Sequence, residues 1–254
     1  MGKSLKLLLE KGIPVLGSFM KLTDPAVAEI FAHAGFDFVI IDMEHGPISP
    51  ERVEDMVRGC ETSGVVPIIR VRDNDPTLIS QALDLGGMAI QVPQIATGSA
   101  ALRAVRAAKF APEGDRGVCR YVRAAAYSHQ SKNVYFREAN RTTAVIVQVE
   151  GEEGISNIAE ILAVKGIDVV FIGPYDLSQS LGVPGDVEHP RVQAKMMEVV
   201  ATARKAGLAV GTFVDDVQTA KKWLALGVQF IAYSVDVGII HQAASQVVRL
   251  ISKE

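Results

Sequence analysis

The chain has 254 residues, of which 48% are hydrophobic, with a formal net charge of -3 and a pI near 6.0. This length and apolar content are enough to fill one large core, and α/β barrels of this size are common as single domains. The weak net charge gives no electrostatic reason to expect nucleic acid or a membrane surface as a partner, so small-molecule chemistry is favoured.

Cysteine usage and the N-terminus exclude further classes. Cys60 and Cys119 are far apart and form no Cys-x-x-Cys pair, so neither a disulfide framework nor a zinc site is predicted. Cys60 lies in a helical pattern and is expected to be a buried packing residue. No apolar run approaches the ~20 residues of a membrane span, and the N-terminal run is too short for a signal peptide. We therefore expect a cytoplasmic protein.

Buried-strand and helix patterns alternate through the first half of the chain. Serine or aspartate stands before proline at the start of three of the helices, which is typical of an N-cap followed by the first helical turn. The predicted strands are 13–19, 38–42, 66–71 and 88–92, and the predicted helices are 24–34, 49–63, 75–86 and 98–109.

The segment 110–141 interrupts this alternation, and we predict a long functional loop there. It carries Arg116, Arg120 and Arg123. These arginines are either a contact for an acidic acceptor substrate or part of a solvated loop or subunit contact. The alternation then resumes. The predicted strands are 143–149, 168–172, 208–213 and 228–233, with helices at 152–163, at 191–206 and after each of the last two strands.

Eight strand-helix units in one chain of this length predict a single-domain α/β TIM (β/α)8 barrel that spans residues 1–254. A doubly wound open sheet is the alternative, but no Gly-x-Gly-x-x-Gly motif follows the first strand. Catalytic groups of such barrels lie at the carboxyl ends of the strands. The polar residues at these positions are Asp42, His45, Arg70, Gln91, Gln148, Glu150 and Asp176.

The most informative of these ends is the segment 38–47, FVIIDMEHGP. Its first four apolar residues predict a strand buried on both faces, and Asp42 and His45 follow before a Gly-Pro turn. An acid and an imidazole are costly to place there unless they have a function. Each residue also has an ordinary explanation, such as a helix cap for Asp42 or an ion pair for Arg70. Their convergence on one rim favours an active site.

Glu150 and Asp176 follow neighbouring strands, so their carboxylates can meet at the rim. Two like charges in contact repel unless one takes a proton or a cation lies between them. Carboxylates without a histidine or cysteine beside them suit Mg²⁺ or Mn²⁺. Arg70 can then stabilise a carboxylate or an enolate, and His45, oriented by Asp42, can carry a proton. The sequence therefore predicts metal-assisted enolate chemistry on a small keto acid.

Four segments resemble the HpcH/HpaI aldolases, which are metal-dependent pyruvate aldolases with a phosphoenolpyruvate/pyruvate-type TIM barrel. They are IDMEHGP at 41–47, PIIRV at 67–71, QVE at 148–150 and GPYDLS at 173–178. The resemblance extends from about residue 16 to the last helix, with the motifs in the same order and at similar spacing.

This resemblance implies a reaction and a core set of residues. Glu150 and Asp176 would bind a divalent metal ion, Mg²⁺, Mn²⁺ or Co²⁺. Arg70 would hold the C2 oxygen of pyruvate, and His45 would be the base. The implied activity is that of a lyase, the reversible cleavage of a 4-hydroxy-2-oxo acid to pyruvate and an aldehyde through a metal-stabilised enolate.

The resemblance also implies supporting residues and an assembly. Asp42 and Asp84 would assist the histidine, Asp84 by reaching another subunit, and Gln148 would lie beside the substrate. Amide groups at Gly173, Tyr175 or Asp176 would contact the pyruvate carboxylate, while the intervening Pro174 has no N–H to offer. The protein would be a homo-oligomer, such as a trimer of dimers, with the last helix exchanged between subunits.

Tyr175 departs from the family pattern, which more often has a small residue there. A phenol would narrow the pyruvate pocket or add a hydrogen bond. Other functions stay open at this stage. A Schiff-base aldolase would need a lysine such as Lys21. An acyl-CoA lyase of the citrate lyase β type would share the enolate chemistry, and a non-catalytic barrel would only bind the keto acid.

Overall fold

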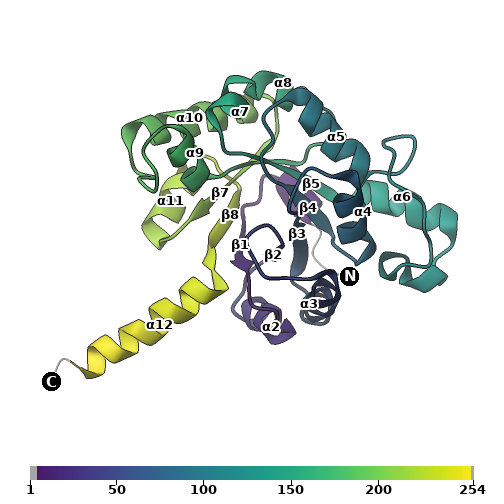
Figure 1. The fold of residues 1–254 in the computed structure, drawn as a ribbon, viewed down its shortest axis with the longest axis horizontal. Coiled ribbons are helices and arrows are strands. Elements are labelled where there is room, and N and C mark those ends of the chain that lie inside the picture. The colour runs from purple at the N-terminus through teal and green to yellow at the C-terminus, as the bar shows by residue number, and fades with distance from the viewer. Residues whose placement is uncertain (1–4, 253–254) are drawn as a thin grey trace.

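The computed structural model describes residues 5–252, which form a closed barrel of eight parallel strands surrounded by helices (Figure 1). The strands pair in sequence order, and β8 closes the barrel against β1. They are β1 (Val15–Met20), β2 (Phe38–Asp42), β3 (Val66–Arg70), β4 (Ala89–Val92), β5 (Ala144–Val149), β6 (Val169–Ile172), β7 (Ala209–Val214) and β8 (Phe230–Val235). The predicted TIM barrel is confirmed.

Helices lie around the barrel, apart from α12, which projects away from it (Figure 1). They are α1 (Leu5–Glu10), α2 (Pro25–His33), α3 (Pro50–Ser63), α4 (Pro76–Asp84), α5 (Gly98–Ala108), the 3₁₀ helix η1 (Arg123–Ser128), α6 (Lys132–Thr142), α7 (Glu152–Ser156), α8 (Ile158–Leu162), α9 (Pro174–Ser180), α10 (Pro190–Lys205), α11 (Val217–Ala225) and α12 (Asp236–Ile251). None of the helices within residues 5–252 combines the length and hydropathy of a membrane span.

Local sequence explains where several helices begin. Asp24 accepts a hydrogen bond from the amide of Ala26, and Asp75 accepts from the amides of Thr77 and Leu78. In both helices proline occupies the first turn, where its missing N–H costs nothing. The predicted Asp-Pro helix starts are therefore confirmed.

The segment 110–141 differs from its prediction as an open loop, because η1 and α6 occupy its second half. Phe110, Ala125 and Tyr135 form a small separate core, with the rings of Phe110 and Tyr135 in edge-to-face contact at 5.8 Å. A polar amphipathic helix of this kind is stabilised mainly by tertiary packing, which the sequence pattern does not reveal.

Two further helices were not predicted in their observed form. The expected helix 152–163 is divided into α7 and α8 at Asn157, whose side-chain amide donates to the carbonyl of Ala96 at 2.9 Å. Residues 174–180, for which no helix was predicted, form α9 with Pro174 in its first turn. This helix begins directly at the rim of the barrel.

The barrel has two hydrophobic cores, one between the strands and the surrounding helices and one inside the barrel. The larger core lies between strands and helices and contains Cys60, as expected for a packing residue. Burial raises the pKa of its thiol to about 12. The other core fills the barrel, where Phe38 and Phe230 stack with ring centres 4.1 Å apart. Above this apolar filling, the strand register aligns Asp42 with Arg70 and Arg70 with Gln91. The interior therefore becomes polar at the carboxyl ends of the strands.

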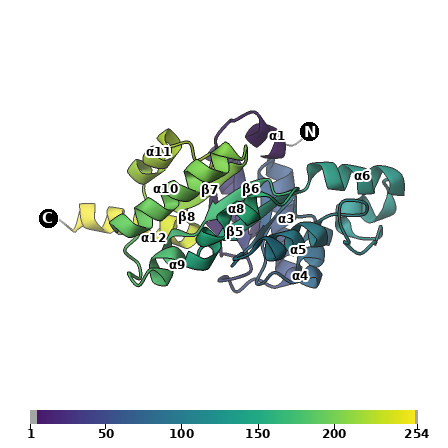
Figure 2. The ribbon, with the colours of Figure 1, turned by 90° about the horizontal axis from the view of Figure 1, so that it is seen from above.

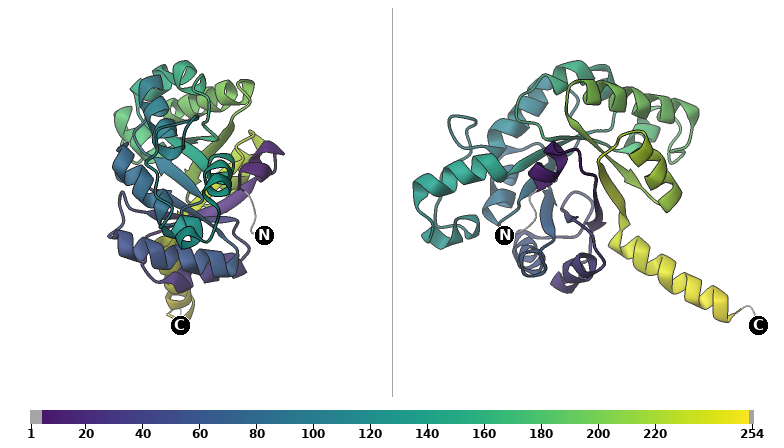
Figure 3. Two further views of the ribbon diagram at one scale, coloured as in Figure 1. Left: turned by 90° about the vertical axis from the view of Figure 1, so that its right-hand side faces the viewer. Right: turned by 180° about the vertical axis from the view of Figure 1, so that it is seen from behind.

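The C-terminal helix α12 projects away from the barrel, on the side opposite α6 (Figures 2 and 3). It contacts mainly β1 and β8 at its start. Its exposed apolar residues are Val237, Ile240, Val247, Val248, Leu250 and Ile251. Exchange of this helix between subunits remains a prediction.

Candidate active site

A cavity of about 340 Å³ lies at the carboxyl ends of the strands. Its walls combine charged and amide side chains with aromatic rings. The lining residues include Phe19, Lys21, Asp42, His45, Arg70, Gln148, Phe171, Gly173, Tyr175, Asp176 and Phe213. The fold therefore brings most of the predicted site residues to one place, as a TIM barrel does with its strand ends.

Arg70, the last residue of β3, is clamped between two carboxylates, Asp42 at the end of β2 and Glu44 in the turn that follows. Its Nε donates to Asp42 Oδ1 at 2.9 Å, and its terminal nitrogens lie 2.8 Å from Asp42 Oδ2 and 3.0 Å from Glu44 Oε2. The guanidinium also stacks over Phe19, 4.6 Å from the ring centre. A guanidinium carries five N–H groups, so about two are left for a ligand.

The two carboxylates respond differently to this clamp. Burial pushes the pKa of Asp42 upward, but hydrogen bonding and attraction from Arg70, with smaller effects of the His45 amide and Lys21, hold it below its usual value. Burial raises the pKa of Glu44, with Arg70 opposing. Asp42 is therefore the permanent anion that balances the arginine.

His45 is positioned through its backbone. Its amide donates to Asp42 Oδ1 at 3.2 Å, and the Glu44 amide donates to the same oxygen at 3.1 Å. The imidazole is 58% exposed, with Nε2 4.0 Å from Glu44 Oε2. Asp42 thus shapes the turn that presents the imidazole at the cavity, where it can exchange a proton with substrate or solvent.

Glu150, just after β5, is buried and held by neutral donors. Its Oε1 accepts from the Gln94 amide at 2.8 Å, and its Oε2 accepts from the side-chain amide of Gln148. Burial raises the pKa of Glu150 to about 7, with additional repulsion from Asp176 and Glu44, although the bonds from Gln148 and Gln94 oppose the shift. No ion pair to Glu150 occurs within residues 5–252.

Gly173 makes room for this carboxylate. A Cβ atom at Gly173 would lie 2.7 Å from Glu150 Oε2 and 2.9 Å from Glu150 Cβ. Any larger residue would therefore displace the side chain. Three residues further on, the exposed Asp176 in the first turn of α9 lines the same cavity.

These carboxylates fit a hard divalent cation. A buried carboxylate with a raised pKa next to a second carboxylate is the arrangement that a cation would stabilise in its ionised form. Across residues 5–252, no group of three or more His, Cys, Asp or Glu side chains is arranged to hold a metal ion. Glu150 and Asp176 would therefore supply two ligands and leave the remaining positions to water and substrate oxygens, as Mg²⁺ sites commonly do.

Tyr175 forms one wall of the cavity. Its hydroxyl donates to Asp215 Oδ2 at 2.5 Å, and its ring packs against Phe213 with centres 5.9 Å apart. Burial and the Asp215 carboxylate raise the pKa of Tyr175 to about 12. The phenol hydroxyl is therefore already hydrogen-bonded at the rim, and the tyrosine lines the cavity beside it.

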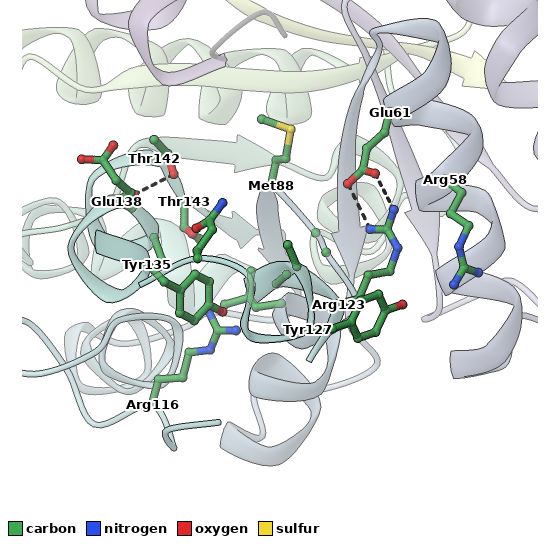
Figure 4. A pocket seen from close by; sticks show the side chains of 17 residues that line it. Arg58, Glu61, Met88, Arg116, Arg123, Tyr127, Tyr135, Glu138, Thr142 and Thr143 are labelled. Carbon is green, nitrogen blue, oxygen red and sulfur yellow. Dashed lines mark hydrogen bonds and ion pairs between the residues drawn. The ribbon is translucent and has the colours of Figure 1, made fainter. Parts of the chain in front are cut away.

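Asp84 and the loop arginines lie elsewhere in the single chain. Asp84, at the end of α4, is 2.5 Å from an Arg116 nitrogen. Arg116 and Arg123 line a cavity of about 770 Å³ beside the beginnings of β4 and β5, where Arg123 pairs with Glu61 (Figure 4). Arg120 stacks on Tyr121. Roles for these residues in the site at the strand ends would require a second subunit.

Several contributors to the site had no predicted role. Glu44 is the second partner of Arg70, and its place between Asp42 and His45 was the available signal. Gln94 contributes its backbone amide, from a left-handed conformation at φ 56°. Asp215 anchors Tyr175 across the rim, a contact that depends on the closure of the barrel.

Comparison with known proteins identifies close relatives. The sequence profile described as HpcH/HpaI aldolase/citrate lyase matches residues 16–243. A 4-hydroxy-2-oxo-heptane-1,7-dioate aldolase from Shigella sonnei is 37% identical over 244 residues, covering 96% of this chain and 93% of that protein. A hydroxypyruvate/pyruvate aldolase from Paraburkholderia phytofirmans is 38% identical over 248 residues, covering 95% of each. The crystal structure of an HpcH/HpaI aldolase/citrate lyase family protein from Burkholderia cenocepacia matches with a TM-score of 0.93 and 37% identity, covering 98% of each chain.

Proposed function

The chain belongs to the HpcH/HpaI aldolase/citrate lyase family and is an aldolase, and from this premise we propose that it reversibly cleaves a 4-hydroxy-2-oxo acid to pyruvate and an aldehyde. The observation that carries the proposal is one small cavity lined by the clamped Arg70, the accessible His45 and Asp176, with the buried carboxylate of Glu150 directly behind Gln148 and Gly173 of its wall. The names of the two aldolase relatives support a 2-oxo acid as the donor.

Glu150 and Asp176 would hold a divalent cation, with Mg²⁺, Mn²⁺ and Co²⁺ as the candidates. When bound, the metal would act as a Lewis acid toward the 2-oxo acid and help to draw electrons from the carbon–carbon bond as it breaks. The raised pKa of Glu150 supports this assignment, because the fold holds a buried carboxylate there without a cationic partner.

Arg70 would direct its remaining N–H groups to the C2 oxygen of the substrate, which gains negative charge as the C3–C4 bond breaks. Asp42 and Glu44 fix the guanidinium beforehand, so it needs no reorientation during the reaction, a condition for effective electrostatic stabilisation. His45 would take the proton from the C4 hydroxyl, directly or through one water molecule.

The neutral groups of the site would orient the donor. Gln148 lines the cavity beside Glu150 and would contact the substrate oxygens. The amides of Tyr175 and Asp176 would receive the pyruvate carboxylate, since Pro174 has no N–H and the Gly173 amide already donates to the carbonyl of Val149 at 3.3 Å.

We also propose a homo-oligomer in which α12 packs against a second copy of the chain. Six large apolar residues of this helix are exposed, and a partner would cover them. Light scattering should give a mass above that of the monomer, and removal of residues 236–254 should lower it. The number of subunits, such as a trimer of dimers, would follow from the same measurement.

The test of the function is aldol cleavage of 4-hydroxy-2-oxo acids, followed as pyruvate release from enzyme stripped with EDTA. Activity that is lost on stripping and returns with Mg²⁺, Mn²⁺ or Co²⁺ is the expected result. Activity that is indifferent to EDTA would contradict the metal assignment.

Two further experiments separate the remaining chemical alternatives. Lys21 lines the cavity, with Nζ 3.7 Å from Asp42 Oδ2, so borohydride trapping with pyruvate tests a Schiff base and is expected to give no adduct. Cleavage of malyl-CoA but not of hydroxy-oxo acids would indicate an acyl-CoA lyase. The aldolase relatives and the small cavity argue against that reaction and against a non-catalytic barrel.

A further inference from the structure

Gln91 places a polar amide in the interior of the barrel, where its side chain is 0% exposed. It belongs to β4 and lies in register with Arg70 of β3 and Ile146 of β5. An aliphatic residue would fill this interior position without introducing polar atoms. The presence of an amide therefore requires an explanation from its hydrogen bonds.

Those bonds form a chain of amides that ends at Glu150. Gln91 Nε2 donates to Gln148 Oε1 at 2.5 Å, and Gln148 Nε2 donates in turn to Glu150 Oε2. The three side chains are 0%, 2% and 7% exposed, so water is largely kept from them. Gln91 is thus linked to the carboxylate through a single intermediate amide.

The first bond of the chain holds the second amide in the orientation that the Glu150 carboxylate also requires. A glutamine amide can rotate by half a turn and exchange its oxygen and nitrogen at little cost in shape. Because Gln91 donates, Gln148 must present its oxygen to Gln91 and its nitrogen to Glu150. Without Gln91, the Glu150 carboxylate alone would hold the Gln148 amide, and the amide could move away from the carboxylate more easily.

The other end of Gln91 argues against a role in stability alone. Its Oε1 is buried without a hydrogen-bond partner among the described residues. Such an oxygen destabilises the folded state. Only the Nε2 group of Gln91 therefore has a hydrogen-bond partner, and that partner is Gln148, which in turn bonds Glu150.

We propose that Gln91 is a positioning residue that orients the Gln148 amide and thereby holds Glu150 in place for a divalent cation. The inference rests on the proposed assignment of Glu150 as a metal ligand. It concerns a side chain that lies outside the cavity lining and reaches the ligand only through Gln148. Groups that orient metal ligands in this way commonly change metal affinity tenfold or more when they are replaced.

The test measures binding of Mn²⁺ to the metal-free enzyme, by the paramagnetic resonance signal of the unbound ion, together with thermal unfolding without metal. Gln91→Met is expected to raise the Kd for Mn²⁺ about tenfold. Its Tm should be unchanged or higher, because the variant loses the unpartnered oxygen. A purely structural amide would give the reverse pattern, with a lower Tm and an unchanged Kd.

A second variant and a double variant make the test specific. Gln91→Asn keeps an amide on a side chain that is one methylene shorter, so the amide no longer reaches Gln148. This variant is expected to weaken Mn²⁺ binding as well. In a Gln148→Met background, Gln91→Met should have no further effect on the Kd, since the intermediate amide is already gone. Thr212→Val, which removes a buried hydroxyl on β7 that bonds Ile172, is the control and should leave the Kd unchanged.

The outcomes separate this inference from the assignment on which it rests. Wild-type enzyme that binds no Mn²⁺, or a Glu150→Gln variant that binds it as tightly as wild type, would overturn the metal site and the inference together. A Gln91→Met Kd within twofold of wild type, with Glu150→Gln defective, would overturn the role of Gln91 alone.

Discussion

The β2–β3 side of the barrel mouth and the β5–β6 side both contain buried carboxylates, but only the first also buries a cation. Asp42 and Glu44 surround Arg70, and the pKa of Asp42 is lowered despite complete burial. Glu150 has only amide donors, and its pKa is raised to about 7. On the β2–β3 side, the buried carboxylates therefore have a cationic partner within the chain, whereas Glu150 has none among the described residues.

This difference indicates that the two sides of the barrel mouth have different functions. A buried carboxylate without a counter-charge stores unfavourable energy that a bound cation can relieve. The paired side instead offers a fixed positive group whose orientation is already set. We therefore expect changes on the β2–β3 side to affect the chemical step and changes on the β5–β6 side to affect the binding of metal.

The largest effect is expected for Arg70→Ala. Loss of the guanidinium should reduce kcat/KM for aldol cleavage by ~100-fold or more, equivalent to ~3 kcal/mol. The Kd for Mn²⁺ should change little. Arg72→Ala, two residues along the chain, is the matched control. If both variants lost activity equally, or if Arg70→Ala also lost Mn²⁺ affinity, the division between the two sides would be wrong.

Glu150→Gln and Asp176→Asn should show the opposite pattern. Each removes one charged ligand, so the Kd for Mn²⁺ should rise ~10-fold to 100-fold and excess metal should restore part of the rate. Glu152→Gln, an exposed change nearby, serves as the control. Unchanged metal affinity in both variants would mean that the ligands are wrongly assigned.

The raised pKa of Glu150 predicts a pH-dependent effect of metal on stability. Its pKa rises from 4.5 to about 7 on folding, so between these values the folded state binds more protons and this group destabilises the metal-free fold as pH rises. Mn²⁺ should therefore raise the Tm more at pH 8 than at pH 5.5. Glu150→Gln should remove that difference, and an equal Mn²⁺ effect at both pH values in wild type would contradict the prediction.

The smallest effect is expected at Tyr175. Because its hydroxyl bonds Asp215 at the rim, Tyr175→Phe should change kcat/KM for pyruvate-forming cleavage by less than about threefold, a change of under ~1 kcal/mol. Tyr175→Ala should widen the cavity and raise the relative activity toward donors larger than pyruvate, such as 2-oxobutanoate. A large loss in the phenylalanine variant would instead indicate a direct contact between the hydroxyl and the substrate.

Periodicity was sufficient for the barrel because each strand is a short run of apolar residues between turn signals. The 38–42 strand was predicted with its observed bounds, and the other strands shifted by a few residues. Residues 110–141 were misread, since α6 has a polar sequence and depends on packing around Phe110. The helix α9 was not predicted, because it is short and follows a Gly-Pro pair directly after the sixth strand.

The site was predictable only where residues follow strands. Asp42, Arg70 and Gln148 could be assigned to the rim because a TIM barrel brings strand ends together. The clamp on Arg70, the backbone contact from Gln94 and the Tyr175–Asp215 bond depend on side-chain geometry between distant segments. Asp84 pairs with Arg116 at the end of α4, and its predicted contact with another subunit remains a prediction.

The most direct test of the contrast between the two sides is a crystal structure with Mn²⁺ and pyruvate, recorded at a wavelength where manganese scatters anomalously. The account predicts one anomalous peak within ligand distance of Glu150 and Asp176, with Asp42 and Glu44 still paired to Arg70. A peak at Asp42 and Glu44, or pyruvate bound with no peak near Glu150, would contradict it.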